Sequence, residues 1–151
     1  MIRSMRPEDR SDYLDMTHEF HHSSAVLHPT PRAYRERTFD HIVGGSPFAR
    51  GYILEEEEGP AGYGIVVFSY STERGGMILW VEELYVRSAF QGRGLGTGFF
   101  RYLKEEFGTL PKGYRLEVAP DNEGAARLYQ RLGYRDVQYR QLFAPDIFPA
   151  G

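Results

Sequence analysis

The chain has 151 residues, of which 41% are hydrophobic and 26% charged, a balance typical of one soluble globular domain with a sizeable core. Its net charge of −3 gives no reason to expect nucleic-acid binding, and the absence of cysteine excludes disulfides, thiolate nucleophiles and thiolate metal ligands. The sequence has neither an apolar run near the ~18 residues of a membrane span nor a signal-peptide core at its N-terminus. We therefore expect a single domain over residues 1–151 in the cytoplasm, with no nucleic-acid or membrane partner.

The first third of the chain predicts a short strand followed by two helices. Residues Met1–Met5 form the strand, and Pro7 begins a helix to about Phe20, because proline and acidic residues favour the first helical turn. A loop over Ser23–Pro31 contains prolines, which interrupt helices, and Arg32–Val43 forms the second helix.

The middle of the chain is rich in β-branched and aromatic residues, which predicts three strands joined by tight turns. The predicted strands are Gly51–Glu56, Tyr63–Ser71 and Met77–Val86, with the first hairpin turn at residues 59–62 and the second at residues 74–76.

The last third alternates helices and strands. Apolar residues at helical spacing predict a helix over Gly94–Phe107, followed by a strand over Tyr114–Val118, a helix over Asn122–Leu132 and a last strand over Tyr134–Phe143. The full order is β-α-α-β-β-β-α-β-α-β. It predicts an α/β (mixed α+β) domain with a central mixed, mostly antiparallel twisted sheet of 6–7 strands and helices on both faces.

The most informative stretch is the glycine-rich segment at residues 91–97, which lies between a strand and a helix. Glycines let backbone N–H groups converge on a ligand, and a helix N-terminus with Arg93 beside it favours an anion such as pyrophosphate. The Walker A motif is excluded because no lysine follows the glycines, and the dinucleotide fingerprint would need glycine at Thr97 or Phe99. An ordinary glycine-rich turn between strand and helix is the alternative.

Two motifs, in order along the chain, resemble the GNAT superfamily of N-acetyltransferases. Residues 91–96 read Q-x-x-G-x-G after the segment L-Y-V at 84–86, which is similar to the superfamily signature Q/R-x-x-G-x-G/A. Residues 122–134 are similar to its N-x-x-A-x-x-L-Y-x-x-x-G-F ending. The resemblance is firm over residues 77–134, and it implies the GNAT fold and an acetyl-CoA-dependent N-acetyltransferase.

The resemblance also implies that acetyl-CoA, the co-substrate, is held by backbone groups. In such proteins the loop amides hold the pyrophosphate and the preceding strand holds the pantetheine arm, with an N–H near Tyr85 or Val86 polarising the acetyl carbonyl. The cofactor-binding residues implied are Leu84, Tyr85, Val86, Gln91, Gly92, Arg93, Gly94, Leu95, Gly96, Thr97, Asn122 and Tyr129.

The second motif implies roles for a tyrosine and an asparagine. The tyrosine that matches Tyr129 commonly protonates the departing thiolate, and a phenol with a pKa of about 10 is a suitable donor. The alternative for Tyr129 is packing in the core. Asn122 begins a predicted helix, so it either caps that helix or hydrogen-bonds the coenzyme arm.

An acidic pair, Glu82 and Glu83, interrupts the apolar strand beside the predicted acetyl position. A protonated amine must lose a proton before it attacks a thioester, and desolvation would raise the pKa of an acid placed there. Strand alternation directs neighbouring side chains to opposite faces, so only one of the pair is expected to face the cleft, and a bulge would change which one. We favour Glu82 as the general base. The alternative is an acid that binds the cationic substrate while water relays the proton.

The identity of the amine that accepts the acetyl group depends on the N-terminal half of the chain. There the resemblance to the superfamily is limited to the order of strands and helices. His21, His22 and Tyr34 lie where the substrate cleft is usually rimmed, as do Ser23, Ser24 and Arg37. The histidines lack an H-E-x-x-H spacing, so no metal is expected. The acidic pair favours a small-molecule primary amine acetylated by direct attack in a ternary complex, in a monomer or a homodimer. The alternatives are a peptide or protein N-acetyltransferase, a non-catalytic acyl-CoA-binding sensor and a nucleotide-dependent transferase.

Overall fold

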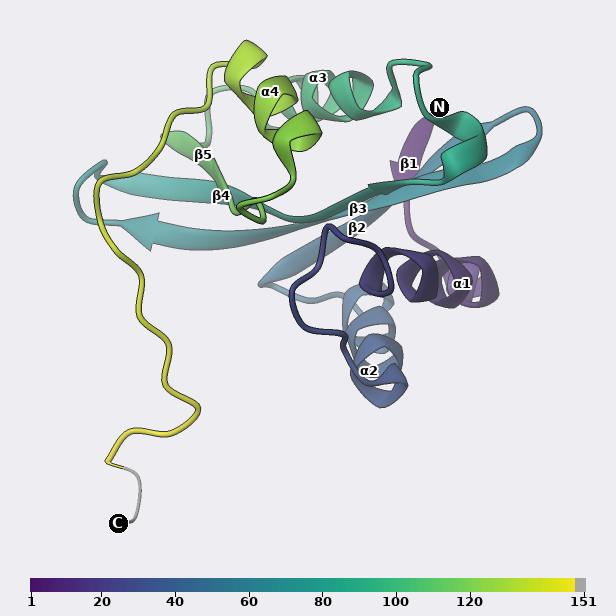
Figure 1. The fold of residues 1–151 in the computed structure, drawn as a ribbon, viewed down its shortest axis with the longest axis horizontal. Coiled ribbons are helices and arrows are strands. Elements are labelled where there is room, and N and C mark those ends of the chain that lie inside the picture. Colours follow the sequence, from purple (N-terminus) through teal and green to yellow (C-terminus); the bar gives the residue numbers. More distant parts are fainter. Residues whose placement is uncertain (149–151) are drawn as a thin grey trace.

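A computed structural model describes residues 1–148, in which five strands form one mixed sheet in the order β1-β2-β3-β4-β5 (Figure 1). All neighbouring strands are antiparallel except β4 and β5, which are parallel. In chain order the strands and α-helices are β1 (Ile2–Ser4), α1 (Arg10–His21), α2 (Arg32–Val43), β2 (Ala49–Glu56), β3 (Gly59–Ser71), β4 (Gly76–Val86), α3 (Leu95–Phe107), β5 (Gly113–Leu116) and α4 (Glu123–Arg131), with 3₁₀ turns at Pro7–Asp9 and Ser88–Phe90.

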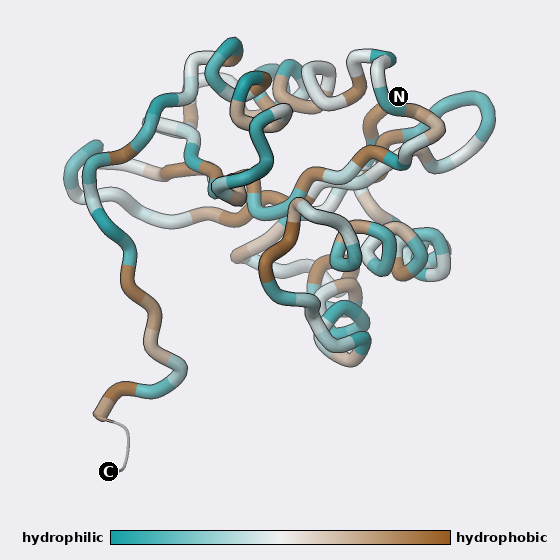
Figure 2. Tube along the Cα trace, viewed as in Figure 1, coloured by the Kyte–Doolittle hydropathy of each residue, from teal (hydrophilic) through white to brown (hydrophobic). Residues whose placement is uncertain are grey.

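The helices cover opposite faces of the sheet, and each face has its own hydrophobic core. Helices α1 and α2 lie on one face, and α3 and α4 on the other (Figure 1). Side-chain alternation along β2 divides its buried residues between the two cores, with Ile53 facing α1 and α2 while Tyr52 and Leu54 face α3. Hydrophobic stretches of the chain lie along the strands and the helices, and further ones lie on the C-terminal tail (Figure 2).

Helix α3 packs against β3 at a position without a side chain. A Cβ atom built on Gly64 would lie 2.3 Å from Cζ of Phe99, whose ring is fully buried. Contacts this short do not occur between real side chains, so the glycine at this position lets α3 lie close to the sheet.

The first hairpin turn lies earlier than the sequence predicts. The turn is formed by Glu57 and Glu58, because Glu56 already pairs with Gly59 and β3 starts there. The predicted turn at residues 59–62 is therefore wrong. These residues belong to β3, where the positive φ of 124° at Gly59 lets the chain leave a two-residue turn.

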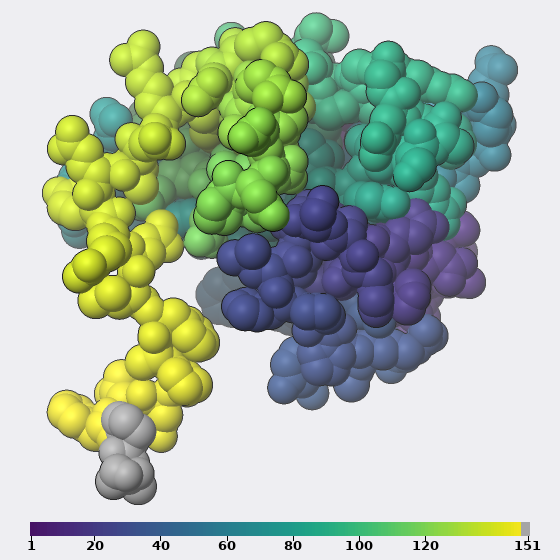
Figure 3. Space-filling model, in the orientation of Figure 1, coloured from purple at the N-terminus to yellow at the C-terminus, as the bar shows by residue number. Residues whose placement is uncertain are grey.

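The predicted last strand is also wrong, and the described sheet has five strands rather than six or seven. Residues 134–143 include aromatic and branched apolar side chains, as strands often do, but they pair with no other strand among residues 1–148. Such a composition makes a segment suitable for a sheet without supplying a partner, and β5 is only 4 residues long, ending at Leu116 rather than Val118. The segment instead passes beside α4 and β5, where the Tyr139 hydroxyl donates to Glu73 at 2.6 Å, and the chain after it runs away from the body of the domain (Figures 1 and 3).

No helix among residues 1–148 is long and apolar enough to cross a membrane.

Candidate active site

The glycine-rich loop ends at the N-terminus of α3. Gly92 and Gly94 have φ angles of 79° and 78°, which glycine adopts without strain, and Gly94 precedes the first helical residue with no side-chain cap. No backbone hydrogen bond of the described turns and loops starts from an N–H of residues 92–97. A Cβ on Gly92 or Gly94 would meet no atom within 4 Å, so the space in front of these amides is open. The loop therefore fits a phosphate group.

Two side chains of the loop have protein partners. Gln91 Nε2 donates to the Val86 carbonyl at 3.1 Å, which holds the loop against the end of β4. The Arg93 guanidinium lies 3.0 Å from Glu58 and stacks 4.9 Å from the Phe90 ring centroid. Arg93 is thus oriented toward the β2–β3 turn rather than toward the loop amides.

Strands β4 and β5 separate beside this loop. They are paired only from Ile78 with Gly113 to Val81 with Leu116, while β4 continues to Val86. Beyond Val81, the edge of β4 that faces away from β3 has no strand partner in the described chain. The structure therefore has a gap between two splayed strands at the end of their pairing.

Backbone register decides which groups of β4 face that gap. The Arg87 amide donates to the Ala61 carbonyl at 2.8 Å, so in this antiparallel pair Tyr85 also bonds toward β3. The amides of Leu84 and Val86 then point to the open side. Leu84, Tyr85 and Val86 are the residues predicted as backbone partners of the coenzyme. The amides of Leu84 and Val86 face the gap, whereas the amide of Tyr85 faces β3.

The acidic pair lies at a β-bulge. Ile65 pairs with Glu83 and Val66 with Val81, which leaves Glu82 as the extra residue of β4. A bulge interrupts the alternation of side chains, and both carboxylates line one cavity of about 230 Å³ on the α1/α2 face. The expectation that only one of the two acids faces the cleft is therefore wrong.

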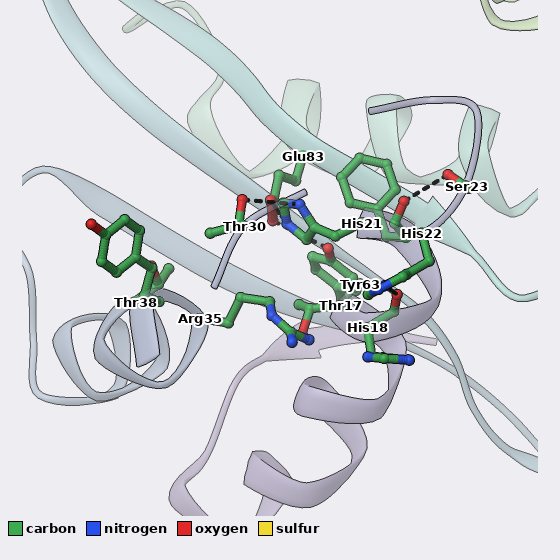
Figure 4. A network of polar contacts seen from close by, with 12 residues as sticks. Thr17, His18, His21, His22, Ser23, Thr30, Arg35, Thr38, Tyr63 and Glu83 are labelled. Atoms are coloured by element: carbon green, nitrogen blue, oxygen red, sulfur yellow. Dashed lines mark hydrogen bonds and ion pairs between the residues drawn. The ribbon is translucent and has the colours of Figure 1, made fainter. Parts of the chain in front are cut away.

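The two acids have different environments. Glu83 accepts a hydrogen bond from His21 Nε2 at 2.9 Å and another from the Tyr63 hydroxyl at 3.1 Å (Figure 4). Glu82 has no side-chain partner among the described residues. Although the Glu82 side chain reaches solvent, desolvation of its carboxyl raises its pKa, and the charges of Glu83 and Glu117 raise it further. The Glu82 carboxylate thus has no side-chain partner among the described residues, whereas two hydrogen bonds hold the Glu83 carboxylate in place.

His21 links α1 to this pair. It is 8% exposed, at the C-terminal end of α1, and its Nδ1 lies 3.1 Å from the Thr30 hydroxyl. Because a carboxylate can only accept, Nε2 donates to Glu83, and in the neutral ring Nδ1 accepts from Thr30. Burial raises the pKa of Tyr63, and the Glu83 charge raises it further, so Tyr63 stays a hydrogen-bond donor.

The other residues predicted to rim the substrate cleft lie outside the cavity. His22 is exposed and contacts the His18 carbonyl at 2.8 Å, and Tyr34 is 55% exposed with Arg37 stacked on its ring. Neither lines the cavity, nor do Ser23 and Ser24.

Sequence reasoning missed five residues with polar groups that line the cavity or support it: Tyr13, Thr30, Arg35, Thr38 and Tyr63. Arg35 had a detectable signal, because it lies on the buried side of α2 with Phe39 and Ile42 at helical spacing. A charge within an apolar stripe suggests a functional residue.

The second motif lies on α4, across the gap from β4. Asn122 caps α4, since its side chain accepts from the Ala125 amide at 3.3 Å. Tyr129 packs between Phe100 and Tyr134, and burial raises its pKa. Its ring lines a second cavity of about 730 Å³ between α4, β5 and residues 134–141. Glu117 lines this cavity, and its charge also raises the pKa of Glu82.

Comparison with known proteins agrees with this geometry. Residues 11–134 match the model of the acetyltransferase (GNAT) family. The chain is 30% identical over 147 residues to a thialysine N-epsilon-acetyltransferase of Mus musculus, covering 90% of this chain and 84% of that protein. It is 35% identical over 105 residues to the Bos taurus protein of the same name, covering 62% of this chain and 60% of that one.

Solved structures share the fold at low sequence identity. A possible acetyltransferase from Clostridium difficile 630 superposes with a TM-score of 0.84 at 17% identity, covering 97% of both chains. AAC(6')-Iy, solved with the bisubstrate analogue CoA-S-monomethyl-acetylneamine, superposes with a TM-score of 0.78 at 13% identity, again over 97% of both chains.

The chain belongs to the acetyltransferase (GNAT) family, which confirms the predicted resemblance. The predicted enzyme class, an N-acetyltransferase, is the class of this family and of the named relatives.

Proposed function

We propose that this chain is an acetyl-CoA-dependent N-acetyltransferase that acetylates a primary amine of a small molecule by direct attack in a ternary complex. The observation that carries the proposal is the position of Glu82. It follows Val81, the last residue of β4 paired with β5, and it combines an unpartnered carboxylate of raised pKa with a place in the α1/α2 cavity. The name of the relatives, thialysine N-epsilon-acetyltransferase, supports a small free amine as acceptor.

The glycine-rich loop and the open edge of β4 are the proposed binding site of acetyl-CoA, which supplies the acetyl thioester. The amides of residues 92–97 hold the pyrophosphate, with Gln91 fixing the loop to Val86. The free amides of Leu84 and Val86 bind the extended arm, and one of them polarises the acetyl carbonyl.

Glu82 is the proposed general base. Its raised pKa makes it a stronger base than an ordinary carboxylate, and it accepts the proton that the substrate ammonium must lose. Glu83, whose carboxylate is held by His21 and Tyr63, lies beside the cationic amine and positions it. Tyr129 donates a proton to the departing thiolate from the α4 side.

Two measurements test the proposal. Thermal unfolding with coenzyme A, acetyl-CoA and ATP in parallel should show stabilisation by the two coenzyme forms, and stabilisation by ATP alone would contradict it. A panel of amines is then assayed for acetyl-CoA-dependent thiol release. A protein that binds acetyl-CoA but releases no thiol with any amine would be a sensor rather than an enzyme.

A homodimer in the cytoplasm completes the proposal. Large apolar side chains of the C-terminal segment are exposed, and the outer edge of β5 has no strand partner among residues 1–148. An exposed apolar segment beside a free edge favours pairing with a second copy. Sedimentation equilibrium tests this assembly, and a monomer at micromolar concentrations would contradict it.

A further inference from the structure

The α1/α2 cavity contains a buried cation that has no counter-ion. Arg35 is 6% exposed, lines the cavity and forms no ion pair with any described residue. Its Nη1 makes only two long contacts, 3.4 Å to the Leu14 carbonyl and 3.3 Å to the Thr17 hydroxyl, and its Nε has no hydrogen-bond partner in the described chain. Figure 4 shows the guanidinium extending from α2 toward Thr17 of α1.

A buried guanidinium without a counter-ion lowers the stability of the folded protein when no ligand is bound. A guanidinium carries five N–H donors, and a buried charge is normally paired with an opposite charge. The two acids that line the same cavity, Glu82 and Glu83, form no ion pair with it, and Glu83 is held by His21 and Tyr63 instead. The unmet donors of Arg35 therefore require an acceptor that the described residues do not supply.

The rest of the lining restricts what that acceptor is. The cavity holds Glu82 and Glu83 as well as Arg35, so it presents both signs of charge within about 230 Å³. A cavity of this volume is large enough for one small molecule. A planar guanidinium matches a carboxylate through two parallel hydrogen bonds.

We propose that Arg35 binds the carboxylate of the acceptor, so that the substrate is a free amino acid whose amine lies at Glu82 and whose carboxylate lies at Arg35. This inference rests on the proposed function for the identity of the amine end. The alternative for Arg35 is a structural link between α1 and α2.

The test compares amines that differ only in the carboxylate. L-lysine is compared with its methyl ester and with cadaverine, and L-alanine with ethylamine, using thiol release from acetyl-CoA. In the wild-type protein, the free amino acid of at least one set should have a kcat/KM about 10- to 100-fold above its carboxylate-free partners, the range expected for a charge-assisted pair. Equal or greater activity with the ester and the plain amine would overturn the proposal.

Variants separate binding from support of the fold. Arg35→Met should remove the preference through KM for the amino acid, with kcat/KM for cadaverine or ethylamine within about 2-fold, and Arg35→Lys should restore part of it. A loss of the same size for all amines would mean that Arg35 only supports the helices. If Arg35→Met does not fold, the wild-type comparison alone decides the question.

A binding measurement distinguishes failure of this inference from failure of the proposed function. Thermal unfolding of the wild-type protein with L-lysine, L-alanine and lysine methyl ester needs no acetyl transfer. Stabilisation by a free amino acid and not by the ester supports the carboxylate site even if no acetylation is found. Acetylation of every amine without regard to the carboxylate overturns only the inference.

Discussion

Glu82 and Glu83 are consecutive residues of β4, and their carboxylates nevertheless line the same cavity because Glu82 is the extra residue of a β-bulge. Glu83 is held by two hydrogen bonds, whereas Glu82 is free and its pKa is raised. One bulge thus places a hydrogen-bonded carboxylate and an unpartnered carboxylate at adjacent positions.

Glu82→Gln should lower kcat/KM by about 100-fold or more, the usual effect of a general base. A base acts when deprotonated, so the acidic limb of the wild-type pH profile should lie above the range of an ordinary glutamate, because the pKa of Glu82 is raised. The loss in the variant should shrink at high pH, where free amine is abundant. Glu83→Gln is the matched control. A larger pH-dependent loss of kcat/KM in Glu83→Gln than in Glu82→Gln would mean that Glu83 is the general base.

The same substitution should increase stability at neutral pH. A folded-state pKa raised above the unfolded value means that stability is lost as pH rises through the folded pKa. Glu82→Gln removes this loss, so its melting temperature should exceed that of the wild type at pH 7, with the difference vanishing below the pKa of an unfolded glutamate. Calorimetry from pH 4 to pH 8 measures the effect, and a destabilised variant at pH 7 would show that desolvation at Glu82 is unimportant.

Gly94→Val should raise the Kd for acetyl-CoA by about tenfold or more, because the side chain would occupy the open space in front of the loop amides. Strain from the positive φ is a separate cost, and Gly75→Val measures it at a similar φ of 65° in the turn between β3 and β4. Both variants should lose stability, and only Gly94→Val should lose affinity in calorimetric titration. Normal affinity in a folded Gly94→Val protein would refute the loop as the phosphate site.

Tyr129→Phe should lower kcat and kcat/KM together by about 10- to 100-fold, with the Kd for acetyl-CoA nearly unchanged. Tyr134→Phe is the control, since Tyr134 packs on the same ring cluster, lines the same cavity and also has a pKa raised by burial. Steady-state kinetics with a good acceptor distinguishes them. Full kcat in Tyr129→Phe would return this residue to a packing role.

Asp9→Asn should lower the free energy of unfolding by about 1–3 kcal/mol at pH 7, because it removes the most buried partner of Arg3 while Glu55 remains bonded to it. Hydrogen bonds from Arg3 hold the pKa of Asp9 below its usual value, so this stabilisation is present at neutral pH and is lost as pH falls through the folded-state pKa. Denaturant unfolding at several pH values measures it. Glu55→Gln, at the more exposed partner of Arg3, should cost less.

The parts of the site that sequence predicted are those encoded by local chemistry. The glycine loop depends on backbone freedom at Gly92 and Gly94, and the capping role of Asn122 depends on its place before a helix. Both can be derived from a few adjacent residues.

What could not be predicted depends on contacts across strands and helices. The bulge at Glu82 is a property of its pairing with β3, and the two-residue period of a strand does not show where an extra residue is inserted. The hydrogen bonds from Tyr63 and His21 to Glu83 join residues 20 and 62 positions apart. The strand predicted over residues 134–143 failed for the same reason, because a suitable pattern does not supply a partner.

The contact between Gly64 and Phe99 has a consequence for protein engineering. Phe99 lies on α3, and the first turn of this helix belongs to the glycine loop. The packing of the Phe99 ring on Gly64 of β3 therefore sets the distance between the loop and the sheet. Grafting residues 91–97 alone onto another scaffold would transfer the loop amides without the contact that positions them. A graft should therefore include the loop, helix α3 and a glycine at the position of Gly64.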